Sequence, residues 1–171
     1  MANQIKSLII HHELGSNGFA GVNEYHRQLW NFKSSLGFFI GYQYYLDKSG
    51  KVWQGRRDDE EGAHTKGRNL DSIGICLEGN LDIELPTPNQ MTSLKALILQ
   101  KMTEYAILPD QVFGHRKFAS YKTCPGRNIS DADIRAFFQP TVSYYQALLN
   151  SLKDMLSKIK LGKAESSCLE K

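Results

Sequence analysis

Short apolar runs alternate with helical patterns along most of this chain, and this alternation restricts the fold more than any other feature. "SLIIHH" (7–12) and "SIGICLEG" (72–79) are continuous apolar runs with the length of buried strands. "QVFGH" (111–115) is a shorter run of the same kind. Interleaved strands and helices predict a single α/β domain in which helices flank a β-sheet.

The segments between these runs supply the helices and a hairpin. Residues 22–37 carry apolar side chains at helical spacing and end at a glycine: Tyr25, Leu29, Phe32 and Gly37. Residues 87–106 open with Thr87 as a candidate N-cap, and Gln90 is placed to complete a capping box. Residues 38–57 predict a hairpin around the turn "DKSG", which would make the sheet mixed.

The composition suits one globular core and excludes several classes of protein. The chain has 171 residues, 41% of them hydrophobic, and a net charge of only +3. No basic run interleaves with aromatic residues, so we expect no nucleic-acid partner. Three widely spaced cysteines do not make a disulfide framework. The N-terminal residues lack the apolar stretch of a secretion signal, so we expect synthesis in the cytoplasm.

The C-terminal residues form a separate part of the prediction. We expect one domain over residues 1–140, an amphipathic helix over 141–160 and a disordered tail over 161–171. The helix would carry an apolar stripe, with lysines elsewhere around it. Packing on its own domain is favoured over contact with a partner or with an anionic membrane.

Two histidines and a cysteine are candidate metal ligands. His11 ends the first apolar run, His115 follows a later one, and Cys124 lies in a loop that Pro125 and Gly126 restrict. Three such ligands leave the fourth position of a tetrahedral zinc open, as catalysis requires. The separations match no short zinc motif. The residues alone therefore favour the alternative, core histidines and a small buried cysteine.

Four longer motifs change that balance: "LIIHHE", "GYQYYLDKSGKVWQGR", "GAHTKGRNLDSIGICLEGN" and "GHRKFASYKTCPG". Their order and distances resemble those of zinc-dependent N-acetylmuramoyl-L-alanine amidases, in the branch of phage lysozyme-amidases and peptidoglycan recognition proteins. The resemblance implies an amidase catalytic domain over residues 1–140. It implies one Zn²⁺ per chain, held by His11, His115 and Cys124. The substrate would be peptidoglycan or a muropeptide, cleaved between N-acetylmuramic acid and L-alanine.

The resemblance also implies that Tyr42 and Lys122 are catalytic. Attack on an amide creates a tetrahedral oxyanion, which needs positive charge or hydrogen-bond donors beside it. Lys122, two residues before Cys124, can stabilise that charge, and Tyr42 can orient water or donate a hydrogen bond. The alternatives are that Lys122 is a solvated surface residue and that Tyr42 packs in the core.

Substrate contacts are implied at His64, Arg68 and Asn69. His64 would touch the substrate or the attacking water, and the alternative is a loop histidine bound to backbone. Arg68 would pair with a carboxylate of the peptide stem or remain solvated. Strand alternation puts Glu78 on the same face as Cys76. Glu78 is therefore a candidate for a catalytic carboxylate, although a weaker one than Tyr42 or Lys122 for the catalytic role.

We therefore expect a bacteriolytic phage or prophage endolysin, held in the cytoplasm until it is released to the cell wall. One alternative is a cytosolic amidase that recycles muropeptides. Such enzymes resemble this family but have a glutamate where this chain has Cys76 and an aspartate where it has Cys124. The other alternative is a recognition protein that binds peptidoglycan, as family members without the cysteine ligand do.

Overall fold

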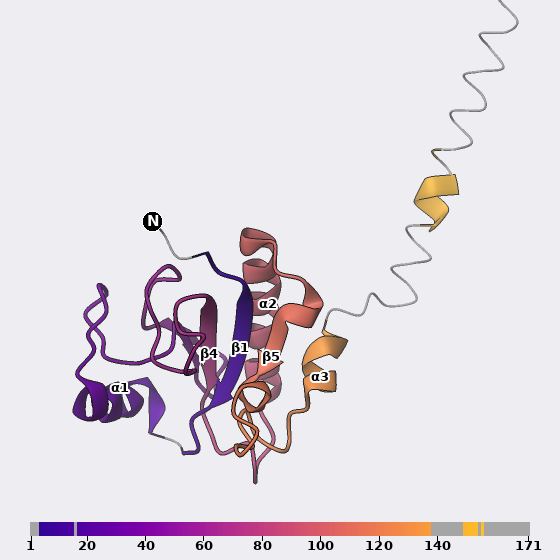
Figure 1. Cartoon of the computed structure of the whole chain (residues 1–171). Helices are drawn as coiled ribbons and strands as arrows, with labels where there is room; N and C mark the ends of the chain where they lie inside the picture. Colours follow the sequence, from indigo (N-terminus) through magenta and orange to yellow (C-terminus); the bar gives the residue numbers. More distant parts are fainter. Residues whose placement is uncertain (1–3, 16, 138–148, 154, 156–171) are drawn as a thin grey trace, which may run out of the picture. The chain divides into compact units, whose positions relative to one another are not determined.

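The computed structural model describes residues 4–15, 17–137, 149–153 and 155. Its centre is a five-stranded mixed sheet in the order β3-β2-β4-β1-β5 (Figure 1). The strands are β1 (Ser7–His12), β2 (Tyr44–Leu46), β3 (Val52–Gln54), β4 (Ser72–Leu77) and β5 (Val112–Gly114). Only the pair β2–β3 is antiparallel. The predicted mixed sheet is confirmed, although the hairpin strands are shorter than residues 38–57 suggested.

Strand β1 lies between β4 and β5, and all six of its residues are buried. This position explains its continuous apolar sequence, because a parallel strand covered on both faces has no solvent side. His11 is opposite Cys76 on β4, and Cys76 is opposite Tyr45 on β2. The three side chains therefore form one row across the sheet.

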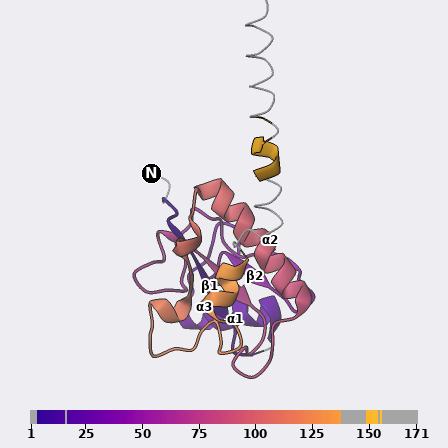
Figure 2. The ribbon, with the colours of Figure 1, turned by 90° about the vertical axis from the view of Figure 1, so that its right-hand side faces the viewer.

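Helices cover both faces of the sheet. They are α1 (Gly18–Trp30), α2 (Pro88–Tyr105) and α3 (Asp131–Ala136), with short 3₁₀ turns at Pro109–Gln111 and His115–Lys117 (Figure 2). Phe19 of α1 packs edge to face on Tyr45, whereas Lys101 of α2 lies over the ring of Tyr44. Because neighbouring strand residues point to opposite faces, α1 and α2 cover different faces. The predicted capping box between Thr87 and Gln90 is confirmed.

The first helix differs from its prediction over residues 22–37. It ends at Asn31, which adopts the left-handed conformation with φ 48° and donates its N–H to the Arg27 carbonyl. Asparagine tolerates this conformation better than other non-glycine residues, so the helix stops well before Gly37. The buried face consists of Phe19, Val22 and His26. The predicted stripe is exposed instead, with Tyr25 at 59% and Leu29 at 51%.

The region after Phe137 belongs to a second unit of the chain. Residues 149–153 are helical, and Leu149 and Leu152 are exposed. The rest of the predicted helix over 141–160 and the predicted tail over 161–171 lie outside the described residues. In the described part of the chain, no helix combines the length and the apolar character needed to cross a membrane.

Candidate metal centre and active-site cavity

The structure brings the three predicted metal ligands together. His11 is near the carboxyl end of β1, His115 directly follows β5, and Cys124 lies in the next loop. All three are buried, and their ligand atoms lie within 4.8 Å of one another. The Cys124 Sγ atom is 3.7 Å from His11 Nδ1. A tetrahedral zinc with ordinary Zn–S and Zn–N bond lengths separates such atoms by about 3.6 Å, so the group fits that metal.

Backbone contacts hold the Cys124 loop against the ends of the strands. The Arg116 N–H donates to the Cys124 carbonyl at 2.7 Å, which ties this loop to the turn that contains His115. Gly126 has φ +113° and packs on Leu81, where an added Cβ would lie 2.5 Å from the Leu81 backbone carbon. A side chain at Gly126, two residues after the cysteine, would therefore clash with Leu81.

Both imidazole ligands are neutral at pH 7. Burial, with a smaller contribution from the positive charge of Lys122, lowers the pKa of His115 to about 4. Burial also holds the pKa of His11 well below its ordinary value. Burial raises the pKa of Cys124 to about 11, opposed by the His12 backbone N–H and by Lys122. Without a metal, the raised pKa keeps Cys124 as a protonated thiol. A divalent cation would favour the thiolate instead, because the negatively charged sulfur is the form that binds the metal.

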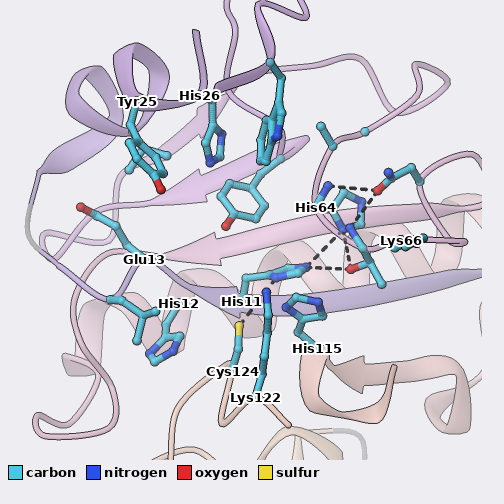
Figure 3. Close-up of a pocket in the computed structure, with 18 of the residues that line it drawn as sticks. His11, His12, Glu13, Tyr25, His26, His64, Lys66, His115, Lys122 and Cys124 are labelled. Carbon is cyan, nitrogen blue, oxygen red and sulfur yellow. Dashed lines mark hydrogen bonds between the residues drawn. The ribbon is translucent and has the colours of Figure 1, made fainter. Parts of the chain in front are cut away.

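The two predicted catalytic residues lie beside this cluster. Tyr42 comes just before β2, and its ring centre is 5.0 Å from that of His11. Burial raises the pKa of Tyr42 well above its ordinary value, helped by the thiols of Cys76 and Cys124, so the phenol keeps its proton. Lys122 extends from the Cys124 loop toward the ligands (Figure 3). The site therefore offers one neutral donor and one positive charge.

His64 contacts a metal ligand directly. Its Nδ1 atom is 3.1 Å from His11 Nε2 and 3.0 Å from Thr65 Oγ1 (Figure 3). Burial lowers the pKa of His64 to about 3, with a smaller contribution from His115, so the ring is neutral. His64 also lines the cavity around the cluster.

The other two predicted substrate residues have different surroundings. Asn69 lines the cavity, and its Oδ1 atom accepts the backbone N–H groups of His64 at 3.0 Å and Thr65 at 2.8 Å. Arg68 is not among the described residues that line the cavity. Its guanidinium binds Asp71 Oδ1 at 2.8 Å and Ser7 Oγ at 3.0 Å instead. The structure thus brings Asn69, but not Arg68, to the site.

The cavity has a volume of about 1040 Å³ and includes residues that sequence reasoning missed. The carboxylate of Glu13 lines it and accepts hydrogen bonds from the Tyr45 hydroxyl and the Asn17 backbone. An aromatic wall also lines it: Tyr25, Trp30 and Phe32. Asn31, a residue suited to ending a helix, was the one sequence signal that could have placed this wall outside the core. Glu78 does not line the cavity, and its carboxylate accepts the Lys48 backbone N–H at 3.0 Å.

Comparisons with known proteins agree with this geometry. A family model described as N-acetylmuramoyl-L-alanine amidase matches residues 1–127. Peptidoglycan-recognition protein SC2 of Drosophila melanogaster is 32% identical over 134 residues, 75% of this chain and 72% of that protein. The endolysin of Escherichia phage T7 is 36% identical over 93 residues, 50% of this chain and 58% of that protein. The solved N-acetylmuramoyl-L-alanine amidase LysC from Clostridium intestinale has a TM-score of 0.69 and 32% identity, covering 78% of this chain and 84% of that chain.

Proposed function

Because the chain belongs to the N-acetylmuramoyl-L-alanine amidase family and is therefore a peptidoglycan amidase, we propose that it uses zinc and acts as a lytic endolysin. The observation that carries the proposal is the buried group of His11, His115 and Cys124. Tyr42 is in ring contact with this group, and the charge of Lys122 acts on it. A cavity of substrate size surrounds them.

The ligand set favours zinc over magnesium and calcium. Two imidazoles and one thiolate are typical zinc ligands, whereas magnesium and calcium prefer oxygen. Three protein ligands leave one coordination position open. When bound, the zinc would act as a Lewis acid and make a water nucleophilic at neutral pH.

The chain's own residues would stabilise the charge that develops during hydrolysis. Lys122 places a positive charge where the carbonyl oxygen becomes negative. Tyr42 keeps its proton and can donate it in a hydrogen bond to that oxygen or to the leaving nitrogen. Each such donor contributes most when it is held in place before the reaction, and Tyr42 is fixed by ring contacts with His11 and His26.

The cavity suits a substrate that combines sugar and peptide. Exposed aromatic side chains such as Tyr25 and Trp30 offer faces for a sugar ring. The polar side chains of Asn69 and Lys66 line the part of the cavity near His64 and would suit the peptide. We propose that the enzyme is made in the cytoplasm and reaches the cell wall after release. Similarity to the T7 endolysin supports this lytic role.

Two alternative functions have weaker support. Similarity to peptidoglycan-recognition protein SC2 would fit a function in binding without hydrolysis, but this chain has Cys124 in ligand position. A muropeptide-recycling amidase would be expected to have a carboxylate at position 76, where this chain has a fully buried cysteine.

A product analysis separates the three functions. The zinc-loaded protein is incubated with intact sacculi and, separately, with soluble anhydromuropeptides, and products are identified by mass spectrometry. A lytic amidase releases stem peptides with free N-terminal L-alanine from sacculi and leaves the glycan strands whole. Cleavage of the soluble substrate alone would indicate recycling. Binding to sacculi without product would indicate recognition, and Cys124→Ser provides the inactive control.

A further inference from the structure

The two ring nitrogens of His11 face different partners. Nδ1 points toward Cys124, whereas Nε2 lies 3.1 Å from His64 Nδ1 and 3.3 Å from Thr65 Oγ1. The Thr65 hydroxyl is also 3.0 Å from His64 Nδ1. Three polar atoms therefore meet on the side of His11 that faces away from Cys124 (Figure 3).

The position of one proton decides whether His11 can bind a metal through Nδ1. A neutral imidazole carries a single N–H, so a free lone pair on Nδ1 requires the proton to be on Nε2. That proton needs an acceptor. The Nδ1 atom of His64 can accept it if the proton of His64 is on its own Nε2. This second Nε2 is buried and has no hydrogen-bond partner among the described residues.

The His64 ring packs tightly against the backbone of two glycines. A Cβ added at Gly74 would lie 2.6 Å from the ring, and one added at Gly62 would lie 2.5 Å from it. Only glycine at these two positions lets the ring lie this close to the sheet. Asn69 fixes the backbone on either side of the ring by accepting the N–H groups of His64 and Thr65. The acceptor is therefore held in place before any metal arrives.

We propose that His64 and Thr65 are positioning residues for the metal centre. They accept the Nε2 proton of His11 and so keep its Nδ1 lone pair directed at the metal. Outer partners of this kind fix the tautomer and the orientation of ligating histidines. The role differs from the substrate contact that the sequence suggested for His64. It rests on the proposed zinc centre.

Zinc affinity is the first test, measured with the metal alone against a chromogenic chelator on the full chain. Loss of an outer partner typically weakens metal binding about 10- to 100-fold. We expect that range for His64→Ala and a smaller loss for Thr65→Val, whose contact is longer. His64→Asn and Thr65→Ser should retain most of the affinity, because an amide oxygen or a hydroxyl still accepts the proton. Lys66→Ala changes the same loop but removes no contact with His11, so this variant should bind zinc as tightly as the wild type.

The tautomer of His11 is the second test, read from the nitrogen chemical shifts of its imidazole in the zinc-loaded wild-type protein. We expect a proton on Nε2 and none on Nδ1. Melting of the zinc-free variants shows whether a lost affinity reflects a lost fold, and the NMR measurement needs no variant. Wild-type affinity in both His64→Ala and Thr65→Val, or a proton on Nδ1, overturns the role. Absence of zinc binding by the wild type overturns the metal centre itself.

Discussion

The ring of Tyr42 packs beside the imidazole of His11, with the ring centres 5.0 Å apart and the planes tilted by 49°. The two residues come from different segments, one before β2 and the other in β1. A proton donor and a candidate metal ligand are thereby held in direct contact. The two residues have different proposed roles: His11 would bind the metal, and Tyr42 would stabilise the transition state. Experiments can measure these two roles independently.

Removal of either proposed catalytic group should lower turnover without loss of zinc. Tyr42→Phe and Lys122→Ala remove a donor and a charge, and neither residue is needed as a ligand. Loss of one such group typically lowers the rate by about 10²- to 10³-fold. Hydrolysis of sacculi gives the rate, and metal analysis gives the zinc content. Wild-type turnover in both variants would show that other groups assist the reaction.

Cys124 should be essential for metal and activity together. We expect one zinc per chain in protein purified without added metal, and little in Cys124→Ser, because a hydroxyl is a much poorer ligand than a thiolate. Zinc should also stabilise the fold, by about 4 kcal/mol when free metal exceeds its dissociation constant 1,000-fold. Calorimetry with and without chelator measures this. Fully active wild-type protein that contains no zinc would contradict the assignment.

The strand pattern was predictable because buried parallel strands leave a continuous apolar signal, as in residues 7–12 and 72–79. The end of α1 was not predictable, because both Asn31 and Gly37 can end a helix and only packing chooses between them. Periodicity therefore placed Tyr25 and Phe32 on one stripe of a single helix, although Phe32 lies beyond the end of α1 and both residues line the cavity.

The metal ligands were predicted through motif resemblance, because their wide spacing carries no local signal. The outer contacts of the site depend on side-chain geometry. Arg68 illustrates this, since its pairing with Asp71 and Ser7 depends on how its loop turns. Thr65 was missed for a related reason: its contact with His11 arises only when the loop carrying His64 folds over β1.

A buried ion pair on the other face of the sheet should contribute to stability. Lys101 of α2 is 5% exposed and binds Asp58 Oδ2 at 2.6 Å, and Asp58 is 9% exposed. Removal of one partner leaves a buried charge and typically costs about 3–5 kcal/mol. We expect a loss of that size in the free energy of unfolding of Lys101→Ala, measured with urea. Lys95→Ala, an exposed position on the same helix, is the matched control. Equal stability of the two variants would contradict the prediction.

The last prediction concerns His26, which is 5% exposed and accepts the Gly41 N–H on Nδ1 at 2.9 Å. Burial, with a smaller contribution from the charge of Arg56, lowers its pKa from 6.5 to about 4. Above pH 6.5 the histidine is neutral in both the folded and the unfolded chain, so it adds no pH dependence. As the pH falls below 6.5, the unfolded chain binds the proton first, and stability decreases until the pH reaches about 4.

The size of this effect follows from the pKa difference, at about 1.4 kcal/mol per unit. Between pH 7 and pH 5, His26 should cost the fold about 2 kcal/mol. His26→Asn keeps an acceptor for the Gly41 N–H but cannot titrate, so it should lack this part of the loss. Urea unfolding of both zinc-free proteins at the two pH values measures the difference, because the other buried histidines contribute equally to each. If the variant lost as much stability as the wild type on acidification, the proton uptake would have to occur elsewhere, and His26 would be only a packing residue.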